Sequence, residues 1–139
     1  MPEPSGPNGH VNLVLVSHSA EIVHGLADLV GQIAGPEVRI VTSGGAVDGS
    51  LGTDGGAVLD AIRTASGGAG AVVLVDLGSS VLSVRAALAE LTDDESGRVG
   101  VADAPLVEGA VAAAVAASTG CTLAEAVAAA QEARNVAKL

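Results

Sequence analysis

Val11-Asn12-Leu13-Val14-Leu15-Val16-Ser17-His18-Ser19 is the stretch that decides the fold. Its apolar part, Val11–Val16, has the length of a strand and is continuous rather than alternating, which predicts a strand buried on both faces of a parallel sheet. A helical pattern of apolar residues begins directly afterwards, at Ile22. In open parallel sheets the reactive groups lie just past the carboxyl ends of the strands. His18 stands at that position.

The rest of the chain repeats this unit of a strand followed by a helix. Such alternation predicts one α/β domain with a doubly wound, mainly parallel four-stranded sheet and helices on both faces. Right-handed crossovers favour the strand order 2-1-3-4. The later strands are expected at Val38–Val41, Ala71–Val75 and Arg98–Ala102. The later helices are expected after Thr53-Asp54, at Val81–Leu91, from Pro105 to Ser118, and from Thr122 to the C-terminus.

The composition is that of a globular domain and excludes several classes of function. Apolar residues make up 49% of the 139 residues, but none is aromatic, so the core must consist of aliphatic side chains. The net charge of −10 argues against binding to nucleic acid, which depends on Lys and Arg, and the lack of aromatic side chains removes platforms for base stacking. Apolar stretches of the ~20 residues that a membrane span needs are missing from the sequence.

Residues 1–10 are rich in Pro, Gly and Ser and lack the basic and apolar regions of a signal peptide. We therefore expect a disordered leader at 1–10, a single domain at 11–139, and a cytoplasmic protein. Cys121 is the only cysteine, so an internal disulfide is excluded and a buried, inert thiol is expected. His24 follows His18 by six residues, which does not place the two rings on one helix face, and no metal site is predicted.

His18 and Asp76 are the two candidate catalytic residues. Unprotonated imidazole is a nucleophile near neutral pH, and the start of a helix disfavours a charged ring and favours a bound anion. Asp76 follows the strand expected at Ala71–Val75, beside the first strand in the order 2-1-3-4. Its carboxylate can therefore fix the tautomer and orientation of the His18 ring. The ordinary alternatives are a histidine that hydrogen-bonds in a turn and an aspartate that caps a helix.

Four further residues are candidates for binding phosphate. Gly78 allows close approach of a ligand to the backbone, and the hydroxyls of Ser19, Thr53 and Ser79 can donate hydrogen bonds to phosphate oxygens. Each of the hydroxyl residues also stands where a helix begins, so helix capping explains it equally well.

Four motifs in a fixed order resemble a known family. They are Val14-Leu15-Val16-Ser17-His18-Ser19, Gly52-Thr53-Asp54, Val75-Asp76-Leu77-Gly78-Ser79 and Ala104-Pro105-Leu106-Val107-Glu108-Gly109. Together they resemble the DhaM phosphocarrier subunits of phosphoenolpyruvate-dependent dihydroxyacetone kinases, whose relevant domain is similar to the IIA domain of mannose-type sugar phosphotransferase systems. The resemblance extends from about Val11 to Val136.

The resemblance implies that His18 is transiently phosphorylated, with Asp76 beside it and Gly78, Ser79 and Thr53 around it. The phosphoryl group would come from the small phosphocarrier protein HPr and pass to ADP, which is held in the nucleotide-binding subunit of the kinase. The resulting ATP would phosphorylate dihydroxyacetone on a third subunit. The carrier domain itself would bind no cofactor or metal and would be a homodimer. An apolar strip at Val107, Val111 and Val115 is a candidate dimer surface.

Two departures from the family pattern help to decide between the dihydroxyacetone kinase branch and the sugar-uptake branch of the family. Some members carry an HPr-like domain after this one, whereas this sequence stops, so HPr is expected to be a separate protein. Mannose-type sugar domains have an aromatic residue in the loop after the acid, and Asp76-Leu77-Gly78-Ser79-Ser80 has none, which favours the dihydroxyacetone branch. The alternatives are a IIA component that passes phosphate to a IIB domain in sugar uptake and a regulatory phosphoprotein of the same fold.

Overall fold

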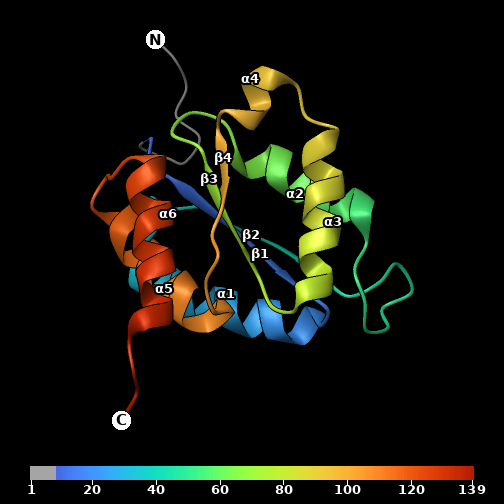
Figure 1. Cartoon of the computed structure of the whole chain (residues 1–139), viewed down its shortest axis with the longest axis horizontal. Coiled ribbons are helices and arrows are strands. Elements are labelled where there is room, and N and C mark those ends of the chain that lie inside the picture. Colours follow the sequence, from blue (N-terminus) through green and yellow to red (C-terminus); the bar gives the residue numbers. More distant parts are fainter. Residues whose placement is uncertain (1–8) are drawn as a thin grey trace.

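A four-stranded parallel sheet forms the centre of the computed structural model, which describes residues 9–139 (Figure 1). Its strands are β1 (Asn12–Ser17), β2 (Ile40–Gly44), β3 (Ala71–Val75) and β4 (Val99–Val101). They lie in the order β2-β1-β3-β4, and every pairing is parallel. The predicted fold class and strand order are therefore confirmed.

Helices cover both faces of the sheet (Figure 1). One face is packed against α1, α5 and α6, and the other against α2 and α3. The bounds are α1 (Ala20–Ala34), α2 (Gly55–Ala65), α3 (Gly78–Ala89), α4 (Asp93–Ser96), α5 (Leu106–Ser118) and α6 (Leu123–Glu132), followed by a 3-10 turn, η1 (Ala133–Asn135). The short α4 and the longer α6 each begin with a capping box, at Thr92 and at Thr122.

The two central strands are buried along their whole length. Leu13 and Leu15 of β1 face the layer of α1, α5 and α6, whereas Val14 and Val16 face α2 and α3. All four side chains have no exposed surface. This explains the continuous apolar run in the sequence, since successive residues of a strand point to opposite faces and both faces here are covered.

Three predicted boundaries are wrong. β2 begins at Ile40 and continues through Thr42-Ser43-Gly44, because it is an edge strand that needs less apolar character than β1 or β3. α3 begins at Gly78, three residues before the expected start, and Leu82 is 67% exposed because Ser80, Val84 and Ala87 face inward. α6 ends at Glu132 rather than near the C-terminus.

The start of the described chain is held against the domain. The ring of His10 bonds to the backbone carbonyl of Ala117 at 2.6 Å and pairs with Glu37 at 2.9 Å. His10 therefore belongs to the packed structure rather than to a leader, and the remainder of the expected leader, residues 1–8, lies outside the described residues. Cys121 is only partly buried, whereas a buried thiol was expected. This partial burial, together with the nearby Glu125 carboxylate, raises the pKa of its thiol.

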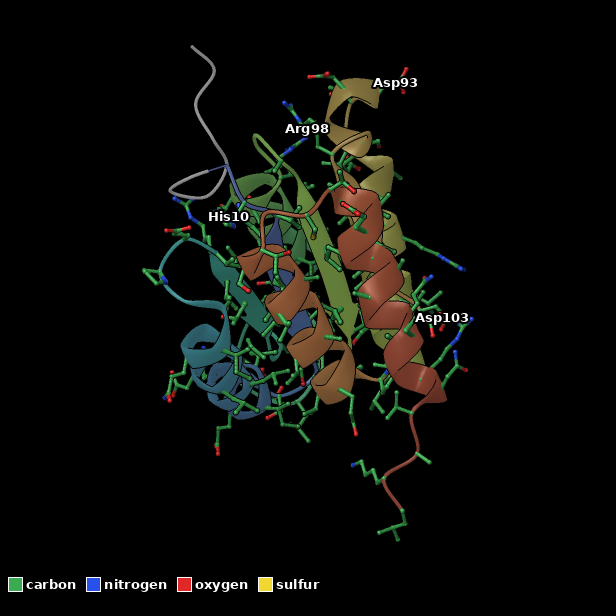
Figure 2. All side chains as sticks on the ribbon, turned by 90° about the vertical axis from the view of Figure 1, so that its left-hand side faces the viewer. His10, Asp93, Arg98 and Asp103 are labelled. Carbon is green, nitrogen blue, oxygen red and sulfur yellow. The ribbon has the colours of Figure 1, made fainter. Side chains whose placement is uncertain are left out.

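Arg98 and Asp103, both labelled in Figure 2, lie just before and just after β4 in the sequence. Arg98 pairs with Asp94 of α4 at 3.2 Å, and Asp103 pairs with Arg134 of η1 at 2.8 Å, so each end of this short edge strand is tied to a neighbouring helical turn. In the part of the chain that the structure describes, the helices are all too short or too polar to cross a membrane.

Candidate functional site

The site lies where β1 and β3 end side by side. His18 directly follows β1 and Asp76 directly follows β3, and the two strands pair in register through Val16 and Val75. The winding of the sheet reverses between these strands, because β2 lies beyond β1 and β4 lies beyond β3. Ligands of doubly wound proteins bind at such switch points. The predicted placement of both residues thus follows from the strand order.

The imidazole of His18 is held on one side and open on the other. Its Nδ1 lies 3.0 Å from Oδ1 of Asp76 and 3.1 Å from the Ser80 hydroxyl, whereas its Nε2 lies 2.6 Å from the Ser79 hydroxyl. A charged carboxylate can only accept a hydrogen bond, so Nδ1 carries the ring proton and donates a hydrogen bond to Asp76. Nε2 of the neutral ring then keeps its lone pair and accepts from Ser79. The side chain retains 22% of its exposure, so the ring is not enclosed in the core.

Asp76 receives hydrogen bonds from five donors. Its Oδ1 accepts from the His18 ring, from the Leu77 N–H at 2.7 Å and from the Ser80 hydroxyl at 2.8 Å. Its Oδ2 accepts from the Ser17 hydroxyl at 2.7 Å and from the His18 N–H at 3.0 Å.

The ionisation of Asp76 follows from these contacts. Burial opposes the charged form, but the donated hydrogen bonds outweigh it and hold the pKa of the Asp76 carboxyl far below its usual range. The carboxylate is therefore charged throughout the physiological pH range. It orients His18 by accepting hydrogen bonds from both the backbone N–H and the ring of that residue.

Two helices begin beside the ring. The Ser19 hydroxyl caps α1 by accepting from the Ile22 N–H at 3.3 Å. The N-cap of α3 is Leu77, whose side chain makes no capping bond, so the N–H groups of Gly78 and Ser79 in the first turn lack a side-chain cap. A Cβ built on Gly78 would meet no atom within 4 Å, so space is open there. The free N–H groups and the dipole favour an anion at this helix start.

The structure brings most of the sequence-predicted site residues together. His18, Asp76, Gly78 and Ser79 share one end of the sheet, and Ser19 lies beside them at the start of α1. The hydroxyl of Thr53 bonds to Ser83 of α3 at 2.6 Å rather than to the ring. Its contact ties the segment before α2 to α3, next to the site.

Sequence reasoning missed two residues, Ser17 and Ser80. Both are fully buried and bond to Asp76, and Ser80 also contacts the ring. A serine at the end of an otherwise apolar buried strand was the available signal for Ser17, because a buried hydroxyl requires a partner. Among the residues that the structure describes, His, Cys, Asp and Glu form no cluster of three or more that is able to hold a metal ion.

The model of the EIIA-man family, described as the fructose IIA component of the phosphotransferase system, matches residues 12–127. The chain belongs to the EIIA-man family. The chain is also similar to a solved crystal structure of a protein of unknown function called EF1359. The two are 37% identical and superimpose with a TM-score of 0.79, and the match covers 92% of this chain and 96% of that one.

Curated relatives of this EIIA-man chain carry a more specific name. The phosphoryl donor subunit DhaM of phosphoenolpyruvate-dependent dihydroxyacetone kinase 2 from Listeria innocua is 40% identical over 105 residues, which are 76% of this chain and 84% of the relative. The DhaM subunit of Escherichia coli is 35% identical over 116 residues, which are 81% of this chain but 25% of that longer protein. The resemblance to DhaM subunits is confirmed.

Proposed function

We propose that this chain is the phosphohistidine carrier of a phosphoenolpyruvate-dependent dihydroxyacetone kinase. His18 accepts a phosphoryl group from phospho-HPr and passes it to ADP bound in the nucleotide-binding subunit, and a further subunit holds dihydroxyacetone. The observation that carries this proposal is the His18 ring, with Nδ1 bonded to a carboxylate and Nε2 at the open edge of the site. The names of the curated relatives support the dihydroxyacetone branch.

Nε2 is the reacting atom in this proposal, because Nδ1 is engaged by Asp76 and Ser80. Its lone pair attacks phosphorus while the bond from phosphorus to the donor's histidine nitrogen breaks and the donor ring keeps that electron pair. The phosphorylated His18 ring retains its Nδ1 proton and gains positive charge, which the carboxylate of Asp76 balances at 3.0 Å. In the second step a terminal oxygen of ADP attacks phosphorus, and the bond to Nε2 breaks. Transfers of this kind depend mainly on positioning and charge stabilisation.

The start of α3 supplies groups for the phosphoryl oxygens. In the resting site the Ser79 hydroxyl bonds to Nε2 at 2.6 Å, so it must rotate away before attack. It then lies within reach of the transferred group, together with the uncapped N–H groups of Gly78 and Ser79. Ser19 and Thr53, which we proposed from the sequence as phosphate ligands, remain candidates at the margin of this site.

The carrier role requires no cofactor bound to this chain, because the nucleotide belongs to the partner subunit and the phosphoryl group rests on His18. The partners are cytoplasmic proteins in this proposal, and we place the chain in the cytoplasm with them.

We also propose that the chain forms a homodimer through the α5–α6 face. A hollow of about 490 Å³ lies there, with Val107, Val111 and Val136 in its walls, and Lys138 pairs with Glu108 at its edge at 2.9 Å. Burial of exposed aliphatic surface favours association. Light scattering at micromolar concentration should therefore give the mass of two chains, and a monomer under these conditions would contradict this surface as a dimer interface.

A label chase tests the proposed relay. With phosphoenolpyruvate, enzyme I and HPr, the chain should take up a label that is acid-labile and stable in base, as phosphohistidine is. After isolation, the labelled chain should lose its label to the ADP-loaded kinase subunit and produce dihydroxyacetone phosphate when all subunits are present. Loss of label to a IIB domain instead would show a sugar-uptake component, and labelling without onward transfer to either would show a regulatory phosphoprotein.

A further inference from the structure

We propose that the loop between β2 and α2, residues 45–52, is a preformed docking element for the protein that phosphorylates His18, with Val47 and Leu51 as its contact residues. This inference rests on the proposed function and extends it by naming a part of this chain that the donor protein contacts. Val47 is 86% exposed and Leu51 is 79% exposed. Exposed aliphatic side chains favour association because a partner that covers them removes apolar surface from water.

The loop is rigidly constructed. The Ala46 N–H bonds to the Ser50 carbonyl at 2.8 Å and the Gly49 N–H to the Ala46 carbonyl at 2.9 Å, which closes a tight turn around Val47. Asp48 accepts from both the N–H and the hydroxyl of Ser50, and these bonds lower the pKa of its carboxyl. A loop that is already ordered loses little conformational entropy when it binds a partner.

The same loop is fastened directly to the catalytic residue. The Gly52 N–H donates to the His18 carbonyl at 2.9 Å, so Leu51 is one residue from a bond to the His18 backbone. Thr53 bonds to Ser83 and thereby links the end of the loop to α3. In Figure 1 the loop stands out from the body at the end of the sheet where β1 finishes and α3 begins. The backbone bond between Gly52 and His18 places the loop beside the residue that a donor protein must reach.

Exposed aliphatic side chains also stand at the start of α3, the helix whose first-turn serines contact His18. Leu77 is 60% exposed at the N-cap of α3, and Leu82 is 67% exposed one turn further along that helix. Exposed aliphatic side chains therefore stand on both segments that bond to His18, the loop that ends at Gly52 and the first turns of α3. An apolar surface on both sides of a reactive atom, with polar residues around it, has the composition of a protein interface.

The charge of the loop indicates its partner. Residues 45–54 contain Asp48 and Asp54 and no Lys or Arg, and Glu21 adds a third carboxylate in the first turn of α1. A partner with an apolar centre and surrounding Lys or Arg side chains complements this surface. The loop therefore fits a donor protein that presents its phosphohistidine within an apolar surface bordered by Lys or Arg side chains.

Replacement of both aliphatic side chains tests the proposal. The double variant Val47→Ser, Leu51→Ser should raise KM for the phosphorylated donor protein about tenfold and leave kcat within about twofold, because the interface is lost but the ring is unchanged. Phosphoramidate, a small donor that needs no docking surface, should label the variant and the unchanged chain at equal rates. Leu139→Ser is the matched control, since Leu139 is fully exposed at the C-terminus and should have no effect on KM.

The possible outcomes distinguish failure of the docking proposal from failure of the proposed carrier function. An unchanged KM in the double variant, with normal labelling of the unaltered chain, would overturn the docking proposal and leave the carrier function intact. Failure of the unaltered chain to accept phosphate from the donor protein would overturn the proposed function and the docking proposal with it. Slower labelling of the double variant by phosphoramidate would show that the substitutions disturb His18 itself, and it too would contradict docking as their role.

Discussion

Substitution of His18 by glutamine should reduce labelling from the phosphorylated donor to the background level. The glutamine side chain fills similar space and can still donate a hydrogen bond to Asp76, but its amide nitrogen has no lone pair available for attack. Because the ring keeps 22% exposure at the protein edge, the substitution should leave the far-ultraviolet circular dichroism spectrum and the cooperativity of unfolding unchanged. We therefore expect His18→Gln to abolish phosphoryl transfer without lowering the stability of the protein.

The matched control for this experiment is His24→Gln, on the exposed surface of α1. It removes an imidazole six residues away and should leave labelling at the level of the unaltered chain. Retention of acid-labile label in the His18→Gln protein would show that another residue carries the phosphoryl group, and the proposed mechanism would then fail.

Asp76→Asn should lower the rate of phosphoryl transfer by about a hundredfold or more. All five contacts of Asp76 are donors, and an asparagine offers one accepting oxygen in place of two. If its NH₂ group faces the ring, Nδ1 must accept and Nε2 takes up the proton, which removes the nucleophile. If its NH₂ group faces the opposite way, it meets the Ser17 hydroxyl and the His18 N–H, which lose their acceptor.

The same variant should unfold more easily, by about 1–3 kcal/mol at neutral pH, because it leaves a donor without an acceptor. The pKa of Asp76 is lowered in the folded protein, so its contribution to stability is present above its unfolded value of 3.8 and is lost as the pH falls toward the lower folded value. The stability difference between the two proteins should accordingly narrow below about pH 4.

A matched control, Asp94→Asn, also removes one carboxylate, but in the exposed α4, and should change neither the transfer rate nor this pH dependence. Transfer by Asp76→Asn at the rate of the unaltered chain would show that the carboxylate does not set the tautomer of His18.

The sequence carries enough information to predict the central strands and their order. Ala71–Val75 is found at its predicted bounds as β3, because both of its faces are covered and each residue must be apolar. The edge strand β2 was misplaced, since its Thr42-Ser43-Gly44 segment has no apolar pattern and its pairing with β1 alone defines it. Glycine is required at position 44 because β2 passes close to the start of α1 there, and a Cβ would lie 2.8 Å from the Ser19 carbonyl oxygen.

The parts of the site that the strand order determines could be predicted from the sequence. The hydrogen-bond partners of individual side chains could not. The strand order brings His18 and Asp76 to adjacent strand ends whatever the rotamers are. The bond of Thr53 to Ser83 and the burial of Ser80 beneath the ring depend on the start of α3, which the apolar pattern placed three residues too late. A helix that begins with Gly-Ser-Ser has no apolar signal in its first turn.

The engagement of Nδ1 by Asp76 and Ser80 leaves His18 with a single approachable nitrogen. For the proposed carrier, donor and acceptor must then occupy the same place in turn, and a ternary complex that transfers phosphate directly is sterically excluded. Turnover is accordingly ping-pong, and an excess of unphosphorylated donor acts as a competitive inhibitor of the second half-reaction. Flux through the pathway thus depends on how quickly the spent donor dissociates as well as on the chemistry at the ring.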